Sequence, residues 1–335
     1  MAPIAIGVVG IGFGQAVIVP AFRRDPRATV AAICASTTER AESVAKRCGI
    51  ARAFGDWRAL ADSVEIEAIA IAVPPALQPE IALAAMRAGK HVFCEKPLAL
   101  TLAASRRLAV AAEASGVANT VDFEFAELPA WRCVKDLVRS GDIGAVREVS
   151  WIWRVETRPR PPDSWKADPA AGAGAIGGFA VHALYLAEWI LGPAVAVEAA
   201  RITSGSQLDT WLALQSGASL SLSVATDAYL GTGHRVELYG DTGTIVVENS
   251  GLDHARGFAV TLGRRSDRTA ARVPLEPDDS DGDGRIAPVA SLANRFLDAI
   301  VYGTTVRPAI ADGVRVAALM QAIEDAARTG QCQKL

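Results

Sequence analysis

A glycine-rich turn follows the first apolar segment of the chain and has the composition of an anion-binding site. Residues 4–9 are apolar and rich in β-branched side chains, and Gly10-Ile11-Gly12-Phe13-Gly14 comes directly after them. Glycines let a backbone approach a pyrophosphate closely, and a helix that starts after the turn adds its N–H groups. The third glycine of the GxGxxG fingerprint falls at Gln15. The turn still lies between a strand and a helix, and this place predicts dinucleotide binding by Gly10, Gly12, Phe13, Gly14 and Gln15.

The residues after the second apolar strand bear on which dinucleotide binds. An acidic residue at the end of this strand would bind both ribose hydroxyls of NAD. Ala35 occupies that position instead, and Ser36, Thr37, Thr38 and Arg40 follow it. Hydroxyls and a guanidinium can hold a 2′-phosphate through charge-assisted hydrogen bonds, which favours NADP(H) over NAD(H). The alternative is that the hydroxyl residues only cap the next helix.

The elements that must position these residues alternate between strand and helix. Apolar runs predict buried strands at residues 4–9, 29–34, 68–73, 90–94 and 117–121. Helices are expected at residues 15–24, 38–48, 79–88 and 101–115, with Pro20 in the first turns of the first helix or bending it. This alternation is typical of a doubly wound parallel sheet, so residues 1–121 are predicted to form an NAD(P)-binding Rossmann domain.

A different pattern begins after residue 121. Residues 151–156 alternate in the manner of a half-buried antiparallel strand, and more strands are expected at residues 195–202, 210–214, 219–226, 234–239 and 244–247. Amphipathic helices are expected at residues 289–302 and 312–330. The predicted fold is therefore α/β: a Rossmann domain followed by a second α/β domain, residues 122–335, with a large open, mostly antiparallel sheet.

Composition bears on partners and location. The formal charge of the 335 residues is -3, so the chain offers no basic surface for nucleic acid. The five cysteines are scattered without CxxC or metal-ligand spacing, which indicates buried thiols in a reducing compartment and no metal site. The N-terminus lacks the pattern of a signal peptide, and no long uninterrupted apolar run predicts a membrane span. We expect a cytoplasmic protein.

The segment Gly89–Ala99, which contains Glu95-Lys96-Pro97, resembles the glucose-fructose oxidoreductase, inositol dehydrogenase and rhizopine-catabolism (Gfo/Idh/MocA) family. Further anchors follow the family order at Val73-Pro74-Pro75, Asp122-Phe123-Glu124-Phe125, Gly141-Asp142-Ile143-Gly144 and Gly240-Asp241-Thr242-Gly243-Thr244. The resemblance spans nearly the whole chain. It implies that the open sheet carries a substrate cleft on one face and an oligomer interface on the other, so a homodimer or homotetramer is expected.

The resemblance assigns Lys96 a place beside the nicotinamide, where its ammonium would bind both the cofactor and the reacting oxygen. A desolvated lysine can polarise a carbonyl or help to move a proton. Pro97, through a cis bond before it, would fix the direction of the lysine. The alternative is a solvated lysine before a helix. The same resemblance adds Val73, Pro74, Pro75, Gln78 and Glu95 to the cofactor site, with Gln78 at a position where many relatives carry histidine.

The second catalytic element of the family is an aspartate followed four residues later by a histidine. His182 keeps its place in the glycine-rich segment 172–185, but Gly178 stands at the aspartate position and Tyr185 at the place of a frequent acid. Without the carboxylate, proton relay must use Lys96, His182, Tyr185 or the substrate itself. A purely structural histidine is the alternative.

The resemblance also indicates substrate-binding residues. Arg158, Arg160 and Trp165 lie in the segment that corresponds to the family's substrate loop, and Glu124 lies at the crossover between domains. The alternatives are that the two arginines are surface charges and that the tryptophan fills the core.

Together these features favour an NAD(P)-dependent oxidoreductase. The expected reaction moves a hydride between the nicotinamide and a carbonyl or secondary alcohol of a sugar, cyclitol or related polyhydroxylated molecule. Two alternatives stay open: a dinucleotide-binding ligand sensor that has lost turnover, and a reductase of imines or conjugated double bonds.

Overall fold

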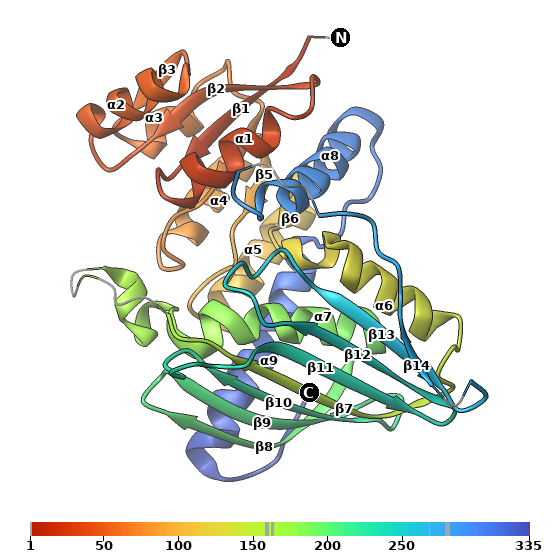
Figure 1. Ribbon diagram of the computed structural model, residues 1–335. Helices are drawn as coiled ribbons and strands as arrows, with labels where there is room; N and C mark the ends of the chain where they lie inside the picture. The colour runs from red at the N-terminus through yellow and green to blue at the C-terminus, as the bar shows by residue number, and fades with distance from the viewer. Residues whose placement is uncertain (1, 158–160, 162–163, 268, 279–281) are drawn as a thin grey trace. The chain divides into compact units, whose positions relative to one another are not determined.

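The computed structural model describes residues 2–157, 161, 164–267, 269–278 and 282–335 (Figure 1). Contacts divide the chain into two compact units, residues 1–124 with 281–317 and residues 125–280 with 318–335. The division at residue 121 stays a prediction of domain organisation. The contact units differ from it because the chain returns to the first unit at residues 281–317 and then re-enters the second unit at residues 318–335.

The first unit is built on a six-stranded parallel sheet with the order β3-β2-β1-β4-β5-β6. Its strands are β1 (Ile4–Val9), β2 (Ala28–Cys34), β3 (Arg52–Phe54), β4 (Ala68–Ile71), β5 (His91–Cys94) and β6 (Asn119–Val121). β1 pairs with both β2 and β4, which makes the carboxyl end of β1 the point at which the strand order reverses. Ligands bind at such a point in doubly wound sheets. The predicted Rossmann fold is confirmed.

The helices of this unit begin and end largely where the sequence predicts. They are the π-helical turn η1 (Gly14–Ile18), α1 (Val19–Phe22), α2 (Thr38–Cys48), α3 (Trp57–Ala61), α4 (Gln78–Arg87), α5 (Leu102–Ser115), α8 (Ile286–Tyr302) and the start of α9 (Ile310–Thr329). Pro20 lies in the first turn of α1, where its missing N–H costs no helical hydrogen bond. Thr101 caps α5 by accepting a hydrogen bond from the Ala104 N–H.

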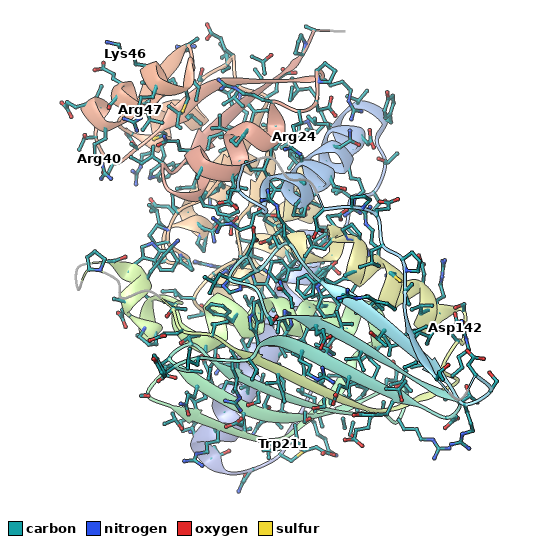
Figure 2. The ribbon with its side chains drawn as sticks, in the orientation of Figure 1. Arg24, Arg40, Lys46, Arg47, Asp142 and Trp211 are labelled. Carbon is teal, nitrogen blue, oxygen red and sulfur yellow. The ribbon has the colours of Figure 1, made fainter. Side chains whose placement is uncertain are left out.

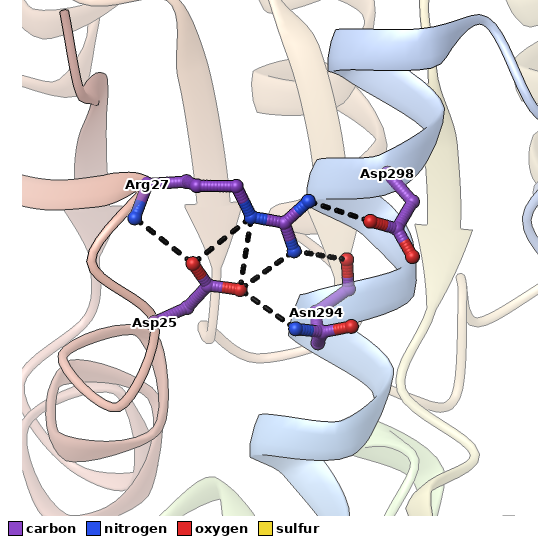
Figure 3. Close-up of polar contacts among 4 residues, drawn as sticks. All are labelled: Asp25, Arg27, Asn294 and Asp298. Carbon is purple, nitrogen blue, oxygen red and sulfur yellow. Dashed lines mark hydrogen bonds and ion pairs between the residues drawn. The ribbon is translucent and has the colours of Figure 1, made fainter. Parts of the chain in front are cut away.

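Helix α8 belongs to the first unit although it follows nearly all of the second sheet in sequence. Phe296 of α8 packs edge-on against Phe22 and Phe93, with ring centroids 6.4 and 5.9 Å apart. Figure 3 shows the polar part of this contact: Arg27 pairs with Asp25 at 2.7 Å and with Asp298 of α8 at 2.6 Å. Apolar burial and a shared guanidinium thus hold α8 on the nucleotide-binding sheet.

The second unit is built on a nine-stranded sheet with the order β14-β13-β12-β11-β7-β10-β9-β8-β15. Its strands are β7 (Val146–Arg154), β8 (Ala194–Thr203), β9 (Gln207–Leu214), β10 (Ser219–Ala225), β11 (Gly233–Gly240), β12 (Gly243–Asn249), β13 (Ala259–Arg264), β14 (Ala270–Arg272) and β15 (Gln333–Lys334). Among the described strands of this sheet, β7 and β10 form its parallel pair and the other neighbours are antiparallel. The predicted mostly antiparallel sheet is confirmed.

Helical segments connect these strands. They are η2 (Glu124–Glu127), α6 (Pro129–Arg139), η3 (Trp165–Ala167), η4 (Pro169–Ala171), η5 (Ala175–Ala180) and α7 (Val181–Leu191). The stretch Pro169–Leu191 is long and apolar enough by composition to cross a membrane, yet 56% of its most apolar window is buried inside the protein. A core helix of a folded domain has this character.

The five cysteines are free thiols but differ in burial. Cys34 and Cys94 are buried, Cys48 and Cys133 are half-buried, and Cys332 is exposed. The prediction that the cysteines are buried is therefore wrong for Cys332, because this residue follows the last helix near the C-terminus, where little of the chain remains to cover it.

Candidate active site

The glycine turn lies at the reversal point of the first sheet. Gly10 has a φ of 112°, and a Cβ on it would overlap the carbonyl oxygen of Ala72, just beyond β4. No residue other than glycine fits at this position. A Cβ built on Gly12 would meet nothing within 4 Å, so the backbone at this position faces open space. The predicted turn thus has the accessible backbone that a diphosphate needs.

Phe13, the large side chain of the turn, has a cationic neighbour that the sequence did not reveal. The Arg285 guanidinium lies 5.1 Å from the centroid of the Phe13 ring. It also pairs with Asp283 at 2.6 Å, and this carboxylate raises the pKa of Arg285. Arg285 immediately precedes α8, so it reaches the turn only because α8 packs on the first unit.

The residues after β2 cap the next helix and place a guanidinium beside a hydroxyl group. Thr37 caps α2, because its hydroxyl accepts a hydrogen bond from the Arg40 N–H. The Arg40 guanidinium donates to the Ser36 hydroxyl at 2.8 Å, and both side chains are exposed. Arg47, a second arginine further along α2, donates to the Gln15 amide oxygen at 3.3 Å. Figure 2 shows Arg40, Lys46 and Arg47 on α2 of the first unit.

The segment Val73-Pro74-Pro75 follows β4 and starts the turn that leads into α4. Gln78 is fully buried, and its amide donates to the Pro97 carbonyl oxygen at 2.7 Å. The peptide bond between Lys96 and Pro97 is cis, as expected. Gln78 therefore holds the loop that carries Lys96, and its amide nitrogen is engaged within the protein.

Lys96 lies among buried carboxyl groups at the carboxyl ends of β5 and β6. Glu95, Asp122 and Glu124 are 9%, 0% and 3% exposed, and Lys96 is half-buried. Burial raises the pKa of Asp122 well above its usual range. The pKa of Glu124 is raised to about 7 by burial, against the lowering effect of the Lys96 charge. Asp122 was missing from the predicted site. The position of an acid directly after each of two neighbouring parallel strands was the signal that could have found it.

His182 lies in the first turn of α7 in the second unit and is 4% exposed. Its ring stacks on Phe125 with centroids 4.4 Å apart and an interplanar angle of 15°, and the Trp153 ring lies 6.5 Å away. Tyr185, three residues further along α7, is 7% exposed. Gly178 lies in η5, and a Cβ on it would meet nothing within 4 Å. Space for a larger side chain therefore exists at this position.

The predicted substrate residues fall in different places. Trp165 begins η3 and is half-buried, with the Lys166 ammonium 5.6 Å from its ring centroid. Glu124 begins η2 and groups by its contacts with the first unit. Arg158 and Arg160 lie outside the described residues.

Two family models match the chain. Residues 4–123 match the oxidoreductase family with an NAD-binding Rossmann fold, and residues 131–246 match the GFO/IDH/MocA C-terminal domain. An uncharacterized oxidoreductase of Synechocystis is 30% identical over 347 residues, which cover 96% of this chain and 94% of the relative. The chain belongs to the Gfo/Idh/MocA family. It is an NAD(P)-dependent oxidoreductase, as the motifs around Lys96 predict.

Other relatives of this Gfo/Idh/MocA protein carry more specific names. The levoglucosan dehydrogenase of Pseudarthrobacter phenanthrenivorans is 29% identical over 88% of this chain and 86% of its own length. A solved structure of levoglucosan dehydrogenase, in complex with NADH and levoglucosan, has a TM-score of 0.87 and 26% sequence identity over 99% of both chains. The fold of the chain is therefore that of an oxidoreductase that has been seen with dinucleotide and sugar together.

Proposed function

We propose that this oxidoreductase interconverts a secondary alcohol and a carbonyl on a sugar, a cyclitol or a related polyhydroxylated molecule, with NADP(H) preferred to NAD(H). The observation that carries the proposal is the half-buried Lys96 among buried carboxyl groups at the ligand-binding edge of the first sheet. A cation desolvated in this way strongly polarises a carbonyl oxygen. The name of the levoglucosan dehydrogenase relative supports the substrate class.

The residues of the first unit fit a dinucleotide. The open backbone at Gly12, with Gly10, Phe13, Gly14 and Gln15, would hold the diphosphate. Residues 73–75 with Glu95 and Lys96 would line the nicotinamide end, and the bound nicotinamide would supply or accept the hydride.

The preference for NADP(H) rests on the residues after β2. Ala35 supplies no carboxylate for the ribose hydroxyls, while the exposed Ser36 hydroxyl and Arg40 guanidinium already contact each other at 2.8 Å. A 2′-phosphate could replace Ser36 as the acceptor for Arg40, with Thr37 and Thr38 beside it. A solved structure of levoglucosan dehydrogenase contains NADH, so the preference of this chain needs its own test.

The remaining side chains are assigned to the substrate. Lys96 donates a hydrogen bond to the reacting oxygen, and His182, with Tyr185 along the same helix, relays the proton to or from that oxygen. Glu124, Trp165 and Arg158 contact the other hydroxyls. Stacking on Phe125 holds the His182 ring in one plane, which favours a fixed direction for the relay.

We also propose a cytoplasmic homodimer or homotetramer that forms through the second sheet. The strand register places Trp211 and Tyr239 on the same face of this sheet, and they are 46% and 39% exposed. Sedimentation of the wild type and of Trp211→Arg tests this: the substitution should shift the protein toward the monomer, and unchanged sedimentation would argue against the interface.

Binding and turnover can be measured separately. NADPH and NADH are titrated against the full chain by fluorescence, and tighter NADPH binding is expected. Sugars, inositols, keto compounds and imines are then screened with the wild type and with Lys96→Ala. Turnover of imines or conjugated alkenes alone would assign a different reductase, and ligand-dependent thermal shifts without turnover would indicate a sensor.

A further inference from the structure

Three carboxyl groups meet at the carboxyl ends of two neighbouring strands. β5 and β6 pair with Cys94 opposite Val121, and the Asp122 N–H donates to the Cys94 carbonyl oxygen at 2.7 Å. Glu95 and Asp122, the first residues after these strands, are therefore neighbours, and Glu124 follows two residues later. Each is at least nine-tenths buried. We call Glu95, Asp122 and Glu124 the carboxyl cluster.

The carboxyl cluster must hold at least one proton. Both carboxyl oxygens of Asp122 are buried, and no described group donates a hydrogen bond to them. A carboxyl group that is buried without donors beside a second acid disfavours its ionised form, so Asp122 keeps its proton. Burial and the charge of Glu95 raise the pKa of Asp122 well above its usual range, which keeps this proton in place at neutral pH.

Glu124 is the member of the cluster that can change its charge near neutrality. Its pKa is raised to about 7: burial and the charge of Glu95 raise it, while Lys96, a backbone hydrogen bond and Arg285 lower it. Within the first unit these are the charged groups that act on Glu124: Lys96 and Glu95 after β5, and Arg285 before α8. Asp122, after β6, is coupled to Glu124 through its own charge. Glu124 is thus balanced between two cations and two acids.

We propose that Glu124, backed by the Glu95–Asp122 pair, stores the proton that the reaction releases or consumes and exchanges it through Lys96. The inference rests on the proposed function and refines one step of it: the proton assigned there to His182 passes through Lys96 to an explicit base, because Gly178 brings no carboxylate to His182. His182 then keeps a hydrogen bond to the substrate. Glu124, which is also assigned to a hydroxyl away from the reacting carbon, acts on the reacting oxygen through Lys96, so in proton transfer it is a positioning residue.

The proton balance is complete in both directions. In oxidation the bound dinucleotide would take up the hydride from the carbinol carbon as the O–H bond of the alcohol breaks. The Lys96 ammonium gives one of its protons to the Glu124 carboxylate and takes the alcohol proton in its place, so Lys96 keeps its charge. Glu124 becomes a carboxylic acid and later releases the proton to water. In reduction the acid returns its proton along the same route to the carbonyl oxygen.

Glu124→Gln tests the assignment because it removes the titrating group and keeps the shape. In the wild type, kcat/KM for oxidation should fall as the pH drops below about 7, and kcat/KM for reduction should fall as it rises above that value. Glu124→Gln should lower both by about 10²-fold and lose both inflections. Glu127→Gln is the matched control, because Glu127 is also buried but pairs with Arg132. It should keep the wild-type profile.

A second measurement separates this proposal from the proposed function. Infrared difference spectra of the full chain, without substrate, should show a carboxylic acid that ionises near neutral pH in the wild type and in Glu127→Gln but not in Glu124→Gln. A wild type that shows this band yet turns over no polyol would sink the proposed function alone. If the band is absent, or if Glu124→Gln keeps both kinetic inflections, the proton store is overturned while the oxidoreductase assignment stands.

Discussion

The two regions predicted to move protons have opposite chemical surroundings. At the carboxyl ends of β5 and β6, Lys96 lies among three buried carboxyl groups whose charges act on one another. At the start of α7, the His182 ring is stacked on Phe125 and near Trp153. The first region can store charge and protons, whereas the second holds an imidazole in a defined plane.

Another histidine of the second unit shows what such aromatic surroundings do. His234 stacks on Trp153 with centroids 4.1 Å apart, and its Nε2 accepts a hydrogen bond from the Trp151 indole at 2.8 Å. Burial lowers the pKa of His234 to about 3, so this ring stays neutral. The comparison teaches that aromatic surroundings keep His234 neutral, whereas the carboxyl group whose pKa is raised to about 7, Glu124, lies in the first unit.

The largest effect is expected from Lys96→Ala. Loss of the cation removes both polarisation and proton transfer, so kcat/KM should fall by about 10³-fold while NADPH binding changes little. Steady-state kinetics measure kcat/KM, and a fluorescence titration measures NADPH binding. Lys334→Ala, near the C-terminus, is the control and should behave as the wild type. A loss below tenfold would move the essential chemistry to the second unit and break the comparison.

Local patterns predicted most of the first unit. The strands β1, β2, β4 and β5 and the helices α2, α4 and α5 lie within a few residues of their predicted bounds, because buried apolar runs and caps such as Thr37 and Thr101 are local signals. β3 and α3 were not predicted, since three and five residues are too few to show a period.

Long-range contacts were beyond local patterns. The docking of α8 on the first unit depends on Phe296 meeting Phe22 and on Arg27 bridging to Asp298, pairs separated by more than half the chain. Arg285 reaches Phe13 for the same reason. The roles of Lys96 and His182 came from resemblance, while the coupling of Asp122 to Glu95 required the register of β5 and β6.

The next effect concerns stability. Glu124 keeps its proton up to about pH 7 in the folded protein but loses it near 4.5 when unfolded. Its own contribution to folding stability is therefore full below pH 4.5 and is lost as the pH rises through about 7. Glu124→Gln removes the free-energy cost of ionising this buried carboxyl group. Above neutrality it should be more stable than the wild type by at most about 3 kcal/mol, and below pH 4.5 the two should be equal.

Urea denaturation at an acidic and an alkaline pH measures this difference. Glu127→Gln should show no comparable gain at alkaline pH, because its carboxylate pairs with Arg132. Equal free energies of unfolding for Glu124→Gln and the wild type at both pH values would show that Glu124 carries no unusual proton, and the contrast between the two regions would weaken.

Cofactor selection gives a smaller effect, also confined to the first unit. Arg40→Ala removes the guanidinium proposed for the 2′-phosphate and should weaken NADPH binding by about tenfold, the contribution of one charge-assisted hydrogen bond. NADH binding should not change. Arg58→Ala, which removes an exposed arginine paired with Glu80, is the matched control. Equal losses for NADPH and NADH with Arg40→Ala would contradict the NADP(H) preference.

The smallest effect is expected from a substitution that adds a charge to the second region. A Cβ at Gly178 meets nothing within 4 Å and the position is helical, so Gly178→Asp should fold without strain. A carboxylate four residues before His182 favours the imidazolium form and orients the ring, so the oxidation rate should rise by roughly fivefold. Gly178→Asn, with the same shape and no charge, should not raise it. If Gly178→Asp also restores activity to the Glu124→Gln variant, the two regions are alternative places for the same proton. If Gly178→Asp changes the activity of neither the wild type nor Glu124→Gln, His182 has a structural role. The first unit then carries the proton chemistry alone.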